Sequence, residues 1–274
     1  MPAKTLHPCD TVTKLTAEHR GGVIVCGSHG GLYSARAAAA AGVRAAIFSD
    51  AGIGMDGAGI ASLAYGLALG MAVAAVAHDS ARIGDAADIM RRGVISRANA
   101  IAQGLGCKPG MACEAAAHAL IAAPQPNAAA PPMIEDRHVL LAPASGLRVV
   151  LIDSAALIRD KDAGAIVITG SHGGLVGNDP AMALRANAFA ACFHDAGVGM
   201  DRAGIMRLPV LDERGIAAMT AAAHSARIGD ALSLYETGIV SHVNQRAASL
   251  GAAPGQTIHD AVVTLSRAAP ARHR

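Results

Sequence analysis

The sequence predicts an α/β fold: a tandem duplication of a three-layer α/β/α unit with mainly parallel strands and pseudo-twofold symmetry between the copies. Three observations lead to it. The chain has 274 residues, 52% of them hydrophobic, which is enough for two cores. It carries an internal repeat, and in each copy short apolar segments alternate with helical ones. We expect the first repeat at residues 1–118, a Pro/Ala-rich linker at 119–148 and the second repeat at 149–274.

The repeat is visible in two long blocks. Asp10 to Gly31 aligns with Asp153 to Gly174 without a gap. After an insertion of two residues, Ala45 to Gly110 aligns with Ala190 to Gly255, and roughly half of these positions are identical. Three motifs recur: GSHGG at 27 and 170, DAGxGMDxAGI at 50 and 195, and SARIGDA at 80 and 225.

Local patterns predict the first elements of the first copy. Asp10 is expected to cap a helix. The β-branched run Val23–Val25 predicts a strand buried on both faces. The alanine-rich stretch Leu32–Ala41 predicts a helix that ends at Gly42.

Alternating strands and helices follow. Residues 45–48 and 71–76 predict strands, with a helix at about 57–69 between them. This order is typical of parallel βαβ units with right-handed crossovers. In the second copy the corresponding strands are expected at 166–168, 190–193 and 216–222.

The end of the first copy predicts two further helices. They are expected at 86–90 and 96–105, with Ser96 as the cap of the second and Gly106 as its end.

One apolar segment resembles a membrane span. Gly57 to Ala77 runs 21 residues without a charge, long enough to cross a bilayer as a helix. Its counterpart in the second copy, Arg202 to Ala222, carries charges in its middle, which a bilayer would not tolerate. Since two copies of one fold should occupy equivalent environments, we expect a core helix followed by a buried strand. The central charges are Arg207, Asp212, Glu213 and Arg214.

The composition excludes several function classes. Charged residues make up 16% and the net charge is +2, so neither a basic nucleic-acid surface nor an acidic tail is present. Aromatic residues are only 2%, which argues against single-strand nucleic-acid binding by stacking of bases on aromatic side chains. An odd number of cysteines without a CxxC pair, and no apolar signal segment at the start, favour a reducing cytoplasmic location. The cysteines are Cys9, Cys26, Cys107, Cys113 and Cys192.

All three motifs follow a predicted strand directly, at the edge where open α/β sheets bind ligands. In GSHGG we therefore predict His29 and His172 as proton-transfer groups, with Ser28 and Ser171 beside them. A tight turn alone would explain the glycines, but it requires no imidazole. The glycine amides are candidates for binding an anion or an oxyanion. These glycines are Gly30, Gly31, Gly173 and Gly174.

The second motif offers two carboxylates in each copy. Asp50 and Asp195 are predicted to orient a catalytic histidine. Asp56 and Asp201 are expected to cap the following helix. The glycine spacing does not match the dinucleotide fingerprint.

The third motif offers a hydroxyl and a guanidinium. Arg82 and Arg227 are predicted to clamp a substrate carboxylate, because a guanidinium binds it in a bidentate pair. The alternative is an internal bridge to Asp50 or Asp85. Ser80 and Ser225 are candidate substrate contacts, and ordinary helix caps are the alternative.

Differences between the copies suggest a metal site as an alternative. His172, His194 and His224 follow three successive strands of the second copy, which fits a three-histidine set. The first copy offers only His29 and His78 in such places. The main prediction is therefore that no cofactor is used, with a divalent metal as the alternative.

These features predict a cofactor-free acid–base enzyme. Hydrolysis of a C–N bond, in an amide or cyclic amide of a small carboxylate-bearing molecule, uses all of the predicted parts. A racemase, isomerase or lyase would use the same histidines. A metal-dependent hydrolase would use the second-copy histidines. A small-anion binding protein would catalyse no reaction. We expect a small anionic or amide substrate, a homo-oligomer, and neither nucleic acid nor membrane as a partner.

Overall fold

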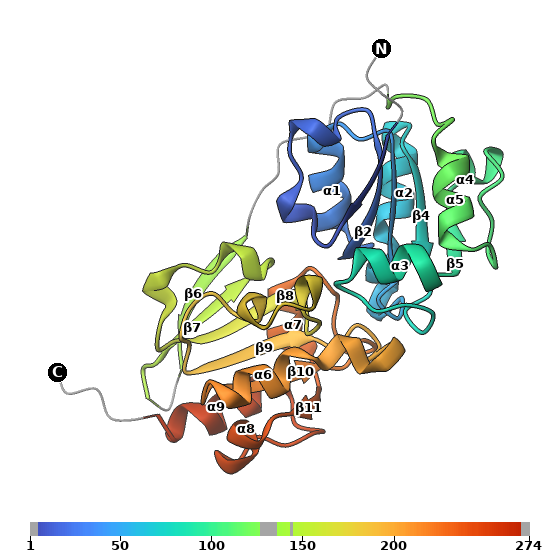
Figure 1. Ribbon diagram of the computed structural model, residues 1–274. Helices are drawn as coiled ribbons and strands as arrows, with labels where there is room; N and C mark the ends of the chain where they lie inside the picture. The colour runs from blue at the N-terminus through green and yellow to red at the C-terminus, as the bar shows by residue number, and fades with distance from the viewer. Residues whose placement is uncertain (1–4, 127–135, 143–144, 270–274) are drawn as a thin grey trace.

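The computed structural model describes residues 5–126, 136–142 and 145–269, which form two similar α/β halves (Figure 1). The first half holds a sheet in the order β1-β2-β3-β4-β5, and the second a sheet in the order β11-β10-β9-β8-β7-β6. Most neighbouring strands are parallel; the pairs β4/β5, β6/β7 and β10/β11 are antiparallel. The predicted α/β fold with two similar halves is confirmed, whereas the twofold relation between them stays a prediction.

The first half follows the predicted alternation. Its strands are β1 (Leu6–Cys9), β2 (Val23–His29), β3 (Ala45–Ser49), β4 (Ala72–Val76) and β5 (Ile95–Ala98). Its helices are α1 (Leu32–Ala41), α2 (Ala61–Leu69), α3 (Ala86–Arg92), α4 (Ala100–Gly104) and α5 (Cys113–Leu120).

The second half has one strand more. Its strands are β6 (Arg137–Leu141), β7 (Arg148–Ile152), β8 (Ile166–His172), β9 (Ala190–His194), β10 (Ala217–Ala221) and β11 (Val240–Val243). Its helices are α6 (Arg207–Glu213), α7 (Ala231–Thr237), α8 (Gln245–Ser249) and α9 (Ile258–Arg267). Strand β6 lies within the segment predicted as a linker, part of which, 127–135 and 143–144, falls outside the described residues.

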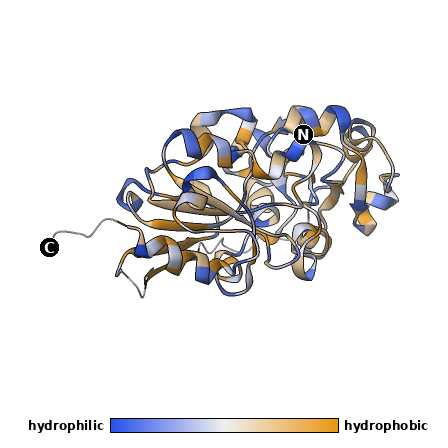
Figure 2. Cartoon of the chain, turned by 90° about the horizontal axis from the view of Figure 1, so that it is seen from below, coloured by the Kyte–Doolittle hydropathy of each residue, from blue (hydrophilic) through white to orange (hydrophobic). Residues whose placement is uncertain are grey.

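Each sheet is covered on both faces, which gives the three layers. In β2, Val23 and Val25 pack toward α3, α4 and α5, while Ile24 and Cys26 pack toward α1 and α2. These strands are buried because helices cover both of their faces. In Figure 2 hydrophobic colour follows the interior strands and hydrophilic colour gathers on the surrounding helices.

The apolar run Gly57 to Ala77 folds as α2 and β4, joined at Gly70, a left-handed residue that ends the helix. Within the described part of the chain, no helix has the length and apolar character needed to span a bilayer.

Several local predictions need correction. Ser96 lies in β5 and caps no helix; Asn99 caps α4 by accepting a hydrogen bond from Ala102 N. Asp10 accepts from Ala86 N and thus serves the start of the distant helix α3. The segment of the second half that should match α1 forms only two short 3-10 turns. Gly177 there adopts a positive φ, and Pro180 cannot continue a preceding helix.

The halves meet through their glycine-rich loops. A Cβ on Gly52 would lie 3.0 Å from Gly197 Cα, so the two loops touch backbone to backbone. Met55 N donates to Ala223 O at 2.8 Å, and the equivalent Met200 N donates to His78 O at 2.8 Å. Equivalent positions therefore make reciprocal hydrogen bonds across the interface.

Candidate functional site

A cavity of about 340 Å³ lies between the halves, which suits a small molecule. Ser28 and His29, at the end of β2, line it from one side. Ser171 and His172, at the end of β8, line it from the other. The structure thus brings the serine and histidine of both GSHGG motifs to one place. We call it the central cavity.

Hydrogen bonds define the protonation of both histidines. Nδ1 of His29 accepts from Gly31 N at 3.1 Å, and Nδ1 of His172 accepts from Gly174 N at 3.1 Å. A neutral imidazole that accepts at Nδ1 carries its hydrogen on Nε2. Among the described residues no hydrogen bond is formed by Nε2 of either ring, and both histidines line the central cavity.

Burial keeps these imidazoles uncharged. It lowers the pKa of His29 to about 3, and the neighbouring His194 adds to the effect. Burial also lowers the pKa of His172 well below its usual value, with further contributions from Arg207, His29 and His194. Both rings are therefore neutral hydrogen-bond donors near pH 7.

The serine side chains both accept hydrogen bonds from backbone amides. Ser28 Oγ accepts from Val12 N at 3.1 Å, and Ser171 Oγ accepts from Ala155 N at 2.9 Å. Because each oxygen acts as an acceptor here, its own O–H remains able to donate.

The glycine amides have other partners than a ligand. All four amides predicted to bind an oxyanion donate within the protein, so the imidazole Nε2–H groups take over as the available donors. For Gly30, Gly31, Gly173 and Gly174 the acceptors are Ser49 O, His29 Nδ1, His194 O and His172 Nδ1.

Asp50 and Asp195 do not line the central cavity; each organises its own loop. Asp50 Oδ1 accepts from Gly52 N at 3.0 Å and from His78 Nδ1 at 3.1 Å. Its hydrogen bond raises the pKa of His78. Asp195 Oδ1 accepts from two backbone amides, those of Gly197 and Ala223. The histidine that Asp50 orients is thus His78, not His29.

The motif arginines are held in ion pairs outside the central cavity. Arg82 bridges to Asp85 at 3.3 Å, the internal alternative considered above. Arg227 bonds Asp230 in its own half and Asp56 across the interface, at 3.2 Å. Asp56 therefore forms an interface ion pair and caps no helix.

The equivalent carboxylate, Asp201, pairs with Arg92 at 2.8 Å and likewise caps no helix. Ser80 donates to Ala77 O and accepts from Val94 N. Ser225 repeats these two bonds with Ala222 O and Ile239 N. Both serines thus close their own loops.

The three-histidine metal set is not assembled. His194 accepts from Ala196 N at Nδ1 and contacts Ala226 O with Nε2 at 3.1 Å, so both of its nitrogens are occupied. His224 is exposed beside a different surface pocket. Within the described residues, no group of three or more histidine, cysteine or acidic side chains is placed to hold a metal ion.

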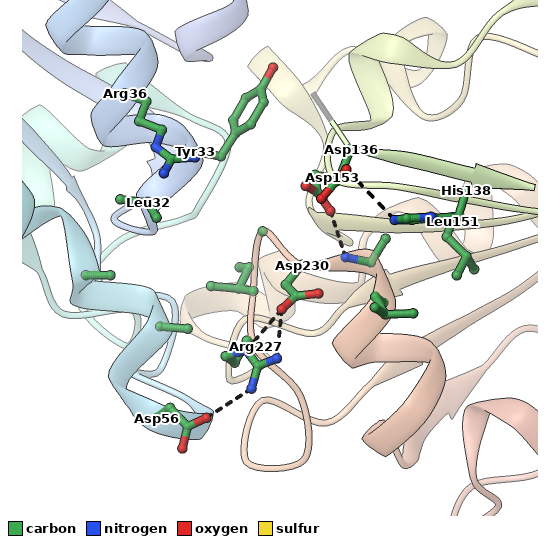
Figure 3. Close-up of a pocket in the computed structure, with 16 residues that line it drawn as sticks. Leu32, Tyr33, Arg36, Asp56, Asp136, His138, Leu151, Asp153, Arg227 and Asp230 are labelled. Atoms are coloured by element: carbon green, nitrogen blue, oxygen red, sulfur yellow. Dashed lines mark hydrogen bonds and ion pairs between the residues drawn. The ribbon is translucent and has the colours of Figure 1, made fainter. Parts of the chain in front are cut away.

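A second cavity of about 460 Å³ adjoins the first and shares Tyr33 and Asp153 with it. Figure 3 shows Tyr33 and Arg36 on one side, Asp153 and Asp136 on the other, and the bridged Arg227 below them.

Two lining residues of the central cavity escape sequence reasoning. Asp153 is partly buried, and burial, Asp230 and Asp136 together raise its pKa. Arg207 is 4% exposed and lies at the start of α6. The sequence does contain a signal for each. Asp153 aligns with Asp10, so an acid is repeated there, and Arg207 aligns with Ser62, so only the second copy has a charge there.

Comparison of the chain with models of protein families, with curated proteins and with solved structures found no match. The chemistry of the central cavity is therefore inferred from its own side chains.

Proposed function

We propose that the chain is a cofactor-free acid–base enzyme that hydrolyses a C–N bond, in an amide or cyclic amide of a small carboxylate-bearing molecule. One observation carries the proposal: two buried neutral imidazoles, His29 and His172, come from different halves and line one cavity. Buried neutral histidines of this kind polarise a carbonyl by donating from Nε2.

In this reaction the imidazoles stabilise charge and do not transfer the proton. The Nε2–H groups of His29 and His172 both donate to the amide oxygen, whose negative charge grows as water attacks the carbon. Asp153 takes the proton from that water, since its raised pKa strengthens it as a base. The same proton then passes to the leaving nitrogen as the C–N bond breaks. Ser28 and Ser171 donate their hydroxyl hydrogens to the bound amide.

An isomerase, racemase or lyase acting on a small carboxylate would use the same groups without water.

A second candidate, a non-enzymatic small-anion binding protein, is favoured by a specific observation. Both Nδ1 atoms are held by backbone amides, so the rings present donors alone, which suits recognition as well as catalysis.

The test uses His29→Ala and His172→Ala with His224→Ala, an exposed histidine, as the control. Turnover of a panel of small amides and cyclic amides bearing a carboxylate is followed by NMR, and folding by circular dichroism. We expect a fall in kcat/KM of at least about 100-fold in the first two variants only, the usual cost of losing an oxyanion donor. Full activity in both would refute the proposed role of the two histidines, and no turnover of any panel member by wild type would refute the enzyme proposal. Ligand-induced melting shifts without any product would favour the binding protein.

A further inference from the structure

Arg207 is held rigidly against the second GSHGG loop. Its backbone N donates to Gly173 O at 2.8 Å, and its Nε donates to Gly174 O at 3.0 Å. Its Nη1 donates to Ala183 O, and its guanidinium carbon lies 4.9 Å from the centre of the Phe193 ring. The guanidinium is therefore fixed in place before any ligand arrives.

This arginine has no acidic partner. Within the described part of the chain it forms no ion pair, and its side-chain hydrogen bonds go to the carbonyls of Gly174 and Ala183. Burial alone lowers its pKa to about 10, without any compensating negative charge. An unpaired buried cation is costly, so a structure that keeps one beside a cavity is prepared for an anion.

The first half lacks this charge. Ser62 occupies the equivalent position, and its backbone N donates to Gly30 O at 2.8 Å just as Arg207 N donates to Gly173 O. The two loops are thus built alike, but only one carries a guanidinium. The central cavity therefore has one strong anion position per chain, on the side of the second half.

We propose that Arg207 binds the carboxylate of a small monocarboxylate in the central cavity, one molecule per chain. This deepens the proposed function, on which it rests, by assigning the substrate carboxylate to Arg207 in place of Arg82 and Arg227. A monoanion fits better than a phosphate dianion. The other arginine of the lining, Arg185, is exposed, and Asp153 adds a carboxylate to the lining of the same cavity.

The test measures binding of acetate, with acetamide and inorganic phosphate as comparison probes, by NMR titration and isothermal calorimetry. Wild type should bind one acetate per chain and bind acetamide and phosphate at least about 10-fold more weakly. Arg207→Met should weaken acetate binding at least about 10-fold. The matched control is Arg44→Met, because Arg44 is also buried and bound to carbonyls, those of Gly21 and Ala123, away from the cavity. It should leave acetate affinity unchanged.

Thermal unfolding separates recognition from a structural role. In acetate-free buffer Arg207→Met and Arg44→Met should both melt lower than wild type, because each leaves two buried backbone carbonyls without their donor. The acetate-dependent rise in Tm should vanish in Arg207→Met and persist in Arg44→Met. Acetate affinity unchanged in Arg207→Met, or phosphate binding more tightly than acetate, would overturn the proposal. Acetate binding that depends on Arg207 supports it even if no amide is hydrolysed, so its failure is distinguishable from failure of the enzyme proposal.

Discussion

The backbone amide of Gly31 donates a hydrogen bond of 3.1 Å to Nδ1 of His29, two residues before it. This bond uses the loop's own backbone to choose the tautomer of the imidazole. It leaves Nε2 as the donor and makes the glycine a part of the site, since a Cβ at position 31 would lie 2.6 Å from that same Nδ1.

Gly31→Ala should therefore displace the His29 ring. We expect a loss of about 1–3 kcal/mol in the free energy of unfolding, the usual cost of overpacking a buried position. Urea denaturation measures it. Gly104→Ala is the control, because nothing lies within 4 Å of a Cβ there, and its stability should stay equal or rise slightly. Equal stability of Gly31→Ala and wild type would show that the loop accommodates the added methyl group without loss of stability.

Acid should destabilise the protein through His29. Its pKa is about 3 in the fold and about 6.5 in the unfolded chain, so the unfolded state takes up the proton first. The contribution of His29 to stability is complete above pH 6.5 and is lost as the pH falls toward 3. At pH 5.5 between about 1 and 2 kcal/mol should be gone. Urea denaturation at pH 7.5 and 5.5 should show a smaller difference for His29→Gln than for wild type, whereas exposed His224→Gln should behave like wild type.

The contact between the halves should depend on backbone packing more than on charge. Gly52 has φ +74° and touches Gly197 backbone, so Gly52→Ala brings both strain and a clash, and should cost more than about 2 kcal/mol. Asp56→Asn breaks the Arg227–Asp56 pair, whose side chains are 44% and 62% exposed, and should cost less than about 1 kcal/mol. Calorimetric unfolding of both variants checks the order of the two losses in stability. A larger loss for Asp56→Asn would show that the ion pair contributes more to the contact between the halves than the backbone packing does.

The sequence predicts elements well where the pattern is local. Helix α1 spans the predicted Leu32–Ala41 and ends at Gly42, because alanines favour the helix and glycine adopts the left-handed cap. The short edge strands β1, β5 and β11 were not predicted. Strands of four residues at a sheet edge show little periodicity, and Pro8 in β1 argues against a strand from sequence alone.

The same distinction applies to the candidate site: residues in local motifs could be predicted, and contacts between distant residues could not. The predicted strands were too short: β2 and β8 continue through the Gly-Ser-His of the motif, so His29 and His172 are their last residues and line one cavity. The fate of Arg227 could not be foreseen, because its partner Asp56 is 171 residues away and belongs to the other half. Arg207 stands outside every repeated motif, since only the second copy carries an arginine at this position.

The pH dependence of turnover should identify the base. If the carboxylate of Asp153 accepts the proton, kcat/KM falls as the pH drops through its pKa, which burial raises first and Asp230 and Asp136 raise further. Asp136→Asn removes one of those charges, lowers the pKa of Asp153 and should move the acidic limb of the profile to lower pH. Because the Asp136 side chain is 68% exposed, the shift should be only a few tenths of a pH unit and should shrink in high salt. Asp260→Asn, equally exposed on α9, should leave the profile in place. An acidic limb that does not move in Asp136→Asn, at low salt, would assign the proton transfer to a group other than Asp153.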